Sequence, residues 1–139
     1  MRDYTLLIDL PHGVDVPDFL AQVVKFTGKP AQRLILTHLD EGDFKTLESL
    51  AKHGVAKIQV SWEIQDRLRK GVVDLPASVL QGLSQRTLIG EKEHFVEFIP
   101  YGSVTGKPGA AVYFSPQKVL FTGPIGVNGP RARLPGSNT

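Results

Sequence analysis

The chain contains no cysteine, and this absence removes several kinds of chemistry at once. Disulfide bonds, zinc sites built from thiolates and cysteine nucleophiles are all excluded. The absence also fits a reducing compartment. The residues after Met1 lack the long apolar segment and the small-residue cleavage site of a signal peptide. We therefore expect a cytoplasmic protein.

Long apolar runs and a strong charge of one sign are lacking too. No apolar stretch is long enough to cross a bilayer, so we expect no membrane partner. Sixteen basic and fourteen acidic side chains leave a formal net charge of +2, which is too small to indicate a nucleic-acid partner. Basic residues gather at Arg67, Arg69 and Lys70 and again at Arg131 and Arg133, which we interpret as a solvated helix end and a polar tail.

The composition is otherwise that of an ordinary folded protein. Hydrophobic residues make up 41% and charged residues 22% of 139 residues, and that length can bury a core without disulfides or metal. We expect a single domain over residues 1–139. Its last part, residues 124–139, is rich in glycine and proline and is expected to be an irregular tail.

The first half of the chain alternates strand patterns with helix patterns. Apolar runs predict strands over residues 4–10, 33–38 and 56–60. The helices that follow them are expected to begin near Asp15, Phe44 and Ser61. Gly28 and Gly54 are expected to end the first two helices. This alternation favours parallel strands joined by right-handed crossovers, and thus an α/β fold.

The second half consists of short strands with tight connections. The predicted strands are residues 87–89, 94–98, 110–114 and 118–122. Ser115-Pro116-Gln117 is a typical turn sequence, so the last two strands are expected to form a hairpin. We expect the pairing in this half to be mostly antiparallel.

The sharpest chemical signal is a group of three candidate metal ligands, His38, Asp40 and Asp43. His38 and Asp40 alternate at the exit of a strand, so both side chains can point toward one ion. Asp43 would return from the first helical turn, and imidazole with carboxylates can hold zinc, manganese or iron. The other interpretation is structural, because acidic residues also stabilise helix N-termini. These residues alone leave both interpretations open.

Five segments between Leu6 and Ser137, in order and with plausible spacing, resemble the metallo-β-lactamase-fold hydrolases. Residues 7–9 resemble the strand that ends in the family's structural aspartate, and residues 34–38 resemble the strand before its H-x-H-x-D-H motif. The later segments are residues 105–114, 118–124 and 129–137, which resemble G-H-T-P-G-S with its strand, V-L-F-T-G-D and G-x-G-R-x-D-L-P-G. The resemblance implies an αββα sandwich, shortened at both ends.

The resemblance also implies that most metal ligands of the family have been replaced. Only the first histidine of the H-x-H-x-D-H motif is present, as His38. The other three motif positions hold Asp40, Gly42 and Asp43. Gly106 stands where a later histidine would be, and Pro124 stands where the bridging aspartate would be. These positions cannot form a two-metal hydrolytic centre, so we assign no catalytic residue.

Two functions follow as alternatives. In the first, the chain is a non-catalytic binding or assembly module without a resident cofactor. In the second, it is a metal-dependent hydrolase in which His38, Asp40 and Asp43 hold one divalent ion, zinc, manganese or iron, that activates water. The sequence does not identify a substrate or small-molecule ligand for either function.

A homodimer is the expected assembly. A sandwich shortened at both ends, as the resemblance implies, would leave sheet edges and apolar surface uncovered. Two copies that meet about a two-fold axis would cover both, since this is the commonest closed oligomer.

Overall fold

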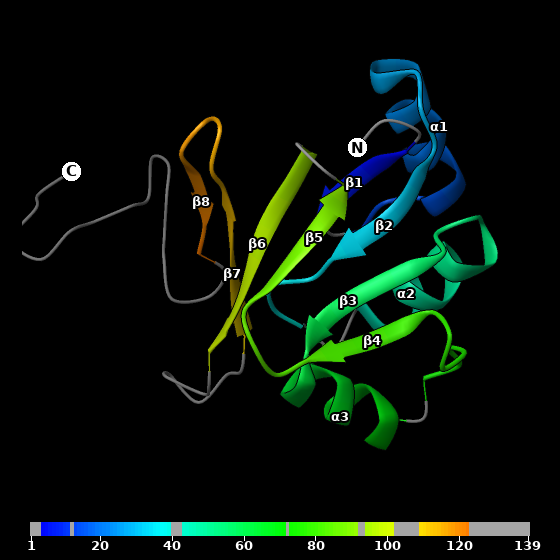
Figure 1. Cartoon of the computed structure of the whole chain (residues 1–139). Coiled ribbons are helices and arrows are strands. Elements are labelled where there is room, and N and C mark those ends of the chain that lie inside the picture. The colour runs from blue at the N-terminus through cyan, green and yellow to red at the C-terminus, as the bar shows by residue number, and fades with distance from the viewer. Residues whose placement is uncertain are drawn as a thin grey trace, which may run out of the picture.

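The computed structural model describes residues 4–11, 13–39, 43–71, 73–91, 94–101 and 109–122. These residues form two four-stranded sheets that pack face to face, with three helices on the outer side of the first sheet (Figure 1). The mixed α/β class predicted from the sequence is confirmed. The expected tail, residues 124–139, lies outside the described residues.

The first sheet is parallel throughout. Its strands, in spatial order, are β1 (Thr5–Ile8), β2 (Ala31–Ile35), β3 (Lys57–Ser61) and β4 (Leu80–Leu83). The helices between them are α1 (Val16–Thr27), α2 (Asp43–Lys52) and α3 (Trp62–Lys70). The predicted alternation of strands and crossover helices is therefore confirmed, and β4 is a strand that the sequence pattern did not reveal.

Local signals fix where the helices begin and end. Gly28 adopts φ 74° just after α1, and its N–H donates to the carbonyl of Val24 at 2.7 Å. A left-handed conformation of this kind favours glycine because it has no Cβ. The hydroxyl of Ser61 accepts a hydrogen bond from the N–H of Ile64 at 3.3 Å and so caps α3, as predicted.

The second sheet is antiparallel throughout. Its strands, again in spatial order, are β5 (Thr87–Glu91), β6 (His94–Tyr101), β7 (Gly109–Phe114) and β8 (Val119–Phe121). A turn closed by a hydrogen bond from the N–H of Lys118 to the carbonyl of Ser115 joins β7 to β8. The predicted hairpin and the antiparallel pairing are both confirmed.

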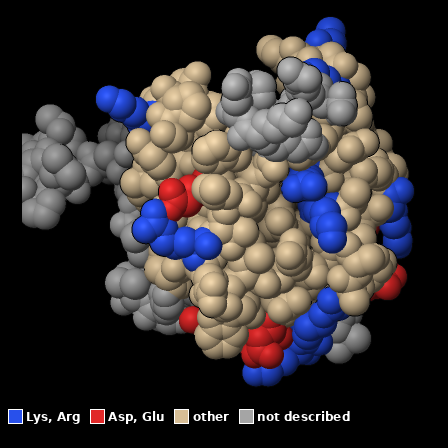
Figure 2. Space-filling model, viewed as in Figure 1, with Lys and Arg blue, Asp and Glu red and all other residues tan. Residues whose placement is uncertain are grey.

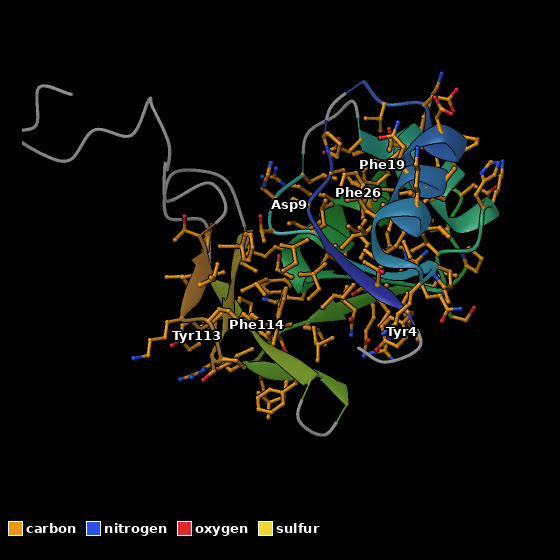
Figure 3. The ribbon with its side chains drawn as sticks, turned by 90° about the horizontal axis from the view of Figure 1, so that it is seen from above. Tyr4, Asp9, Phe19, Phe26, Tyr113 and Phe114 are labelled. Atoms are coloured by element: carbon orange, nitrogen blue, oxygen red, sulfur yellow. The ribbon has the colours of Figure 1, made fainter. Side chains whose placement is uncertain are left out.

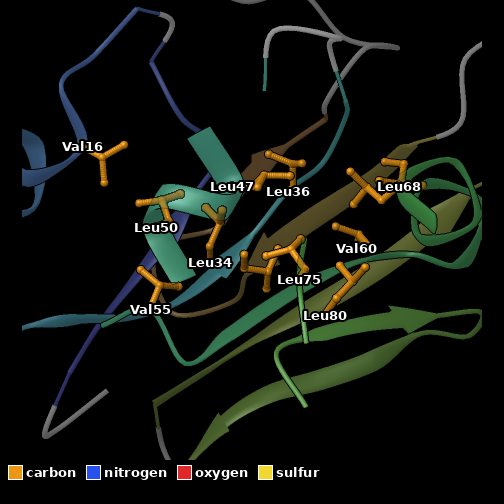
Figure 4. Close-up of a cluster of buried hydrophobic side chains, with 12 residues drawn as sticks. Val16, Leu34, Leu36, Leu47, Leu50, Val55, Val60, Leu68, Leu75 and Leu80 are labelled. Carbon is orange, nitrogen blue, oxygen red and sulfur yellow. The ribbon is translucent and has the colours of Figure 1, made fainter. Parts of the chain in front are cut away.

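Two apolar cores lie on opposite faces of the first sheet. The larger core fills the space between this sheet and the helices (Figure 4), and the smaller core fills the space between the two sheets. Successive residues of a strand point to opposite faces. Leu34 therefore belongs to the first core and Ile35 to the second, and both are fully buried.

The described helices cover only one side of the sandwich. All three pack on the first sheet, and within the described residues no helix covers the outer face of the second sheet, where Leu88 is 62% exposed. The second helical layer implied by the αββα resemblance is thus not found in the part of the chain that the structure describes. A physical reason is that tight antiparallel connections, unlike parallel crossovers, need no helix.

The described helices and the surface charge bear on two kinds of partner. No described helix combines the length and apolar character that a membrane span requires. On the face seen in Figure 2, Lys and Arg side chains lie in small groups separated by uncharged surface, some of them beside acidic side chains. The expectation that nucleic acid does not bind stays a prediction.

We expect Phe98→Ala to lower the free energy of unfolding by about 3–5 kcal/mol. Phe98 is fully buried between the two sheets, so its truncation would remove apolar contacts and leave a cavity. Leu88→Ala, on the neighbouring strand but largely exposed, should change the value by only about 0.5 kcal/mol. Urea unfolding would measure both, and equal losses would contradict the two-sheet core.

Candidate functional site

A polar cluster lies where β1 and β2 end. The carboxyl ends of neighbouring parallel strands meet at one edge of a sheet, which is where α/β proteins commonly bind their ligands. Asp9 follows β1 directly and lies at the opposite end of that strand from Tyr4 (Figure 3). Thr37 and His38 follow the end of β2.

Asp9 joins the ends of the two strands. Its carboxylate accepts hydrogen bonds from the N–H of Thr37 at 2.7 Å and from the hydroxyl of Thr37 at 2.6 Å. Asp9 has φ 60°, a left-handed conformation that aspartate tolerates better than most residues. This structural role is the one that the sequence resemblance implied for Asp9.

Thr37 also connects the first sheet to the second. Its side chain and backbone are fully buried, and its carbonyl accepts a hydrogen bond from the N–H of Ala110 on β7 at 2.9 Å. The close approach requires glycine at the preceding position. A Cβ on Gly109 would lie 2.8 Å from the carbonyl oxygen of Thr37 and 2.7 Å from the hydroxyl oxygen of Tyr101.

His38 lies beside the bond between Asp9 and Thr37. Its Nδ1 is 3.1 Å from the hydroxyl oxygen of Thr37 and 3.8 Å from a carboxylate oxygen of Asp9. Since the Thr37 hydroxyl donates its proton to Asp9, its oxygen can accept from an N–H at Nδ1. That arrangement favours the tautomer in which Nε2 keeps a lone pair. The side chain of His38 is 35% exposed.

The three predicted metal ligands are only partly covered by the structure. Asp43 is the first residue of α2 and is 7% exposed, whereas Asp40 lies outside the described residues. Among the described residues, no three His, Asp or Glu side chains come together in a group that could hold a metal ion. The proposed set of His38, Asp40 and Asp43 therefore stays a prediction. Gly42, Gly106 and Pro124 also lie outside the described residues.

A second feature, which the sequence did not reveal, is an apolar cleft beside β1. Its volume is about 430 Å³, within the range of small-molecule pockets. It is lined by Tyr4, Thr5, Leu6, Ile8, Thr27, Lys29, Val96, Phe114 and Phe121. We call it the edge cleft, because it opens between the edge strand β1 and strands β6, β7 and β8. The sequence could not reveal it, since it depends on how the two sheets are placed.

We expect Asp9→Asn to lower the free energy of unfolding by about 1–3 kcal/mol, because the substitution removes a charged acceptor of two hydrogen bonds. The variant keeps the size of the side chain and its tolerance of a positive φ. Asp74→Asn is the matched control, since Asp74 is exposed, and should change the value by less than about 0.5 kcal/mol. Chemical unfolding would show both, and identical curves would contradict the role given to Asp9.

Gly109→Ala should weaken the contact between the sheets. The new Cβ would force the backbone of β7 away from Thr37, and we expect a loss of about 1–3 kcal/mol of unfolding free energy from overpacking. Backbone hydrogen exchange would then be faster at Ala110, whose N–H binds the Thr37 carbonyl. Unchanged exchange at Ala110 would show that the link tolerates a side chain.

Comparisons with known proteins show likeness in structure only. No family model matches the sequence, and no curated protein was found to be similar. A putative diflavin flavoprotein A 5 (fragment 1-254) from Nostoc sp. PCC 7120 superposes with a TM-score of 0.69 at 20% identity, over 86% of this chain and 48% of that one. The flavodiiron core of Flv1 from Synechocystis sp. PCC6803 gives 0.69 at 21% identity, over 87% and 31%.

A third similar structure is the flavodiiron protein from Giardia intestinalis, with a TM-score of 0.60 at 14% identity, over 84% of this chain and 29% of that one. The chain thus spans half or less of the length of each of these proteins. Such low identities show the fold alone. The chain shares with these three proteins a mixed α/β fold that is metallo-β-lactamase-like.

Proposed function

We propose that this chain acts as a non-catalytic binding and assembly module built on a metallo-β-lactamase-like fold. The observation that carries the proposal is the edge cleft, an open apolar surface between an edge strand and the second sheet. Exposed apolar surfaces of this kind commonly mark interaction sites, because water contact with them is unfavourable.

The polar cluster supports the same function. Both carboxylate oxygens of Asp9 accept hydrogen bonds from Thr37, and the Thr37 carbonyl binds the second sheet. These groups hold three strands together and are thus engaged in structural bonds. By the sequence resemblance, Gly106 and Pro124 stand where the family has metal ligands, and neither residue has a side chain that binds metal.

A single-metal hydrolase is the second candidate, and the orientation of His38 favours it. Hydrogen bonds at Nδ1 of a histidine typically orient the ring so that Nε2 binds the metal. The Thr37 hydroxyl, 3.1 Å from Nδ1, is placed to do this. Asp43 would supply a carboxylate from the start of α2, and a bound divalent ion would activate water.

A pair of iron ions, which the names of the flavodiiron neighbours suggest, does not fit the donor set of the described residues. Two-metal sites need several carboxylates and histidines from different elements. The described residues bring together no group of three such side chains. The metal alternative that we propose is a single ion at His38, Asp40 and Asp43.

Metal analysis separates the two functions. The protein would be purified without a chelator or a histidine tag, dialysed against zinc, manganese or iron(II), and analysed by mass spectrometry for metal content. We expect well below one ion per chain and no difference between the wild type and His38→Ala. One ion per chain that is lost in both His38→Ala and Asp43→Asn would establish the single-metal alternative. Two ions per chain would show that the ligand assignment is wrong.

A further inference from the structure

The free edge of β1 presents backbone groups that no described strand pairs with. β1 has β2 on one side, and within the described residues no strand lies on its other side. The N–H groups of Thr5 and Asp9 donate to the carbonyls of Pro30 and Ile35, toward β2. Because successive residues of a strand alternate, the N–H groups of Leu6 and Ile8 face away from β2, toward the free edge.

The edge of the second sheet is open on the same side. β8 is the last strand of that sheet, and Phe121 of β8 lines the edge cleft together with Leu6 and Ile8 of β1. Val119, Leu120 and Phe121 are all exposed, at 40%, 47% and 41%. Both sheets thus end at one side of the sandwich, with apolar side chains at each edge.

β1 and β8 are short, but neither strand contains the charged residues or proline that commonly block pairing at an edge. Natural edge strands are protected by lysine, proline or inward-pointing charges. β1 reads Thr-Leu-Leu-Ile and β8 reads Val-Leu-Phe, so neither contains a charged residue or a proline. The cleft has one charged lining residue, Lys29, which has an interaction partner within the chain. With a single charged lining residue in each copy, most of the surface can face a copy of itself without repulsion between like charges.

We propose that a second copy of this chain closes the edge cleft, with β1 pairing antiparallel to β1 of the partner about a two-fold axis. This inference rests on the proposed function as an assembly module and names its partner. An axis at Leu7 would place Leu6 opposite Ile8 of the partner subunit. These two residues would exchange both N–H and carbonyl hydrogen bonds, as in an antiparallel ladder. The two four-stranded parallel sheets would become one continuous sheet.

The same axis brings the remaining apolar surface together. Directly opposite residues in an antiparallel pair point to the same face. Leu6 and Ile8 of both copies would therefore form one continuous apolar surface on the face of the joined sheet that packs against the second sheets. The β8 strands of the two copies then approach each other over this apolar surface.

β8 offers a matched pair of residues for a test. Phe121 pairs with Val112, whose side chain lies in the core between the sheets, whereas Leu120 pairs with Tyr113 on the opposite face. Phe121 therefore points toward the cleft and Leu120 points away from it. The two residues are neighbours in the same strand with similar exposure, so Phe121→Lys and Leu120→Lys differ mainly in the face that receives the charge.

The molar mass of each protein would be measured by light scattering and sedimentation equilibrium over micromolar concentrations. We expect a dimer for the wild type and for Leu120→Lys. We expect Phe121→Lys to raise the dimer dissociation constant by about tenfold or more, with a thermal unfolding curve that confirms a folded chain. Hydrogen exchange on the wild type gives a reading that needs no variant, because the amides of Leu6 and Ile8 should be protected only at concentrations where the dimer forms.

Several results would overturn the inference. They are a wild-type monomer across the concentration range, a dimer that Phe121→Lys leaves intact, a dimer that Leu120→Lys disrupts, or rapid exchange of Leu6 and Ile8 in the dimer. If the protein is a monomer and an apolar dye binds in the edge cleft, the cleft binds a different partner and not a second copy of the chain. The proposed function as a binding module would then stand, because metal analysis tests it separately.

Discussion

The hydrogen bonds of Thr37 hold the architecture together. Its N–H and hydroxyl bind the Asp9 carboxylate at the end of β1, and its carbonyl accepts from Ala110 at the start of β7. One buried residue thus fixes three strands of two sheets. Each sheet contributes its own apolar residues to the cores, and apolar packing is not directional. The polar link therefore sets how the sheets are placed, and hydrogen bonds to a carboxylate are stronger than neutral ones.

The same interaction explains where the sequence-based strand boundaries were wrong. The apolar patterns predicted strands over residues 4–10 and 33–38, whereas β1 ends at Ile8 and β2 ends at Ile35. Asp9 turns into a left-handed conformation, and the N–H of Thr37 binds its carboxylate and not a neighbouring strand. Helix caps such as Gly28 and Ser61 could be read directly, because they act within a few residues. β4 was missed because Leu80-Gln81-Gly82-Leu83 has little strand propensity.

The candidate site could be predicted only in part for a similar reason. The family resemblance identified Asp9 as a structural aspartate and His38 as a candidate ligand, and the structure shows the two side by side. It gave no role to Thr37 or Gly109, since their importance comes from a contact between residues more than seventy positions apart. The edge cleft was invisible for the same reason. A run such as Val119-Leu120-Phe121 shows which residues are apolar, but the partner surface depends on the packed sheets.

The strand orders have a consequence for the way this chain acquires its structure. In both sheets every pair of neighbouring described strands is consecutive along the sequence, so the described strands of each sheet come from one continuous stretch of chain. Folds with short sequence separation between contacts cross lower entropic barriers and fold faster. During synthesis, the parallel half can form while the antiparallel half is still emerging from the ribosome. The hydrogen bond between Ala110 and Thr37 can form only after β7 has been synthesised. The two sheets would therefore be joined late, after the first sheet has formed.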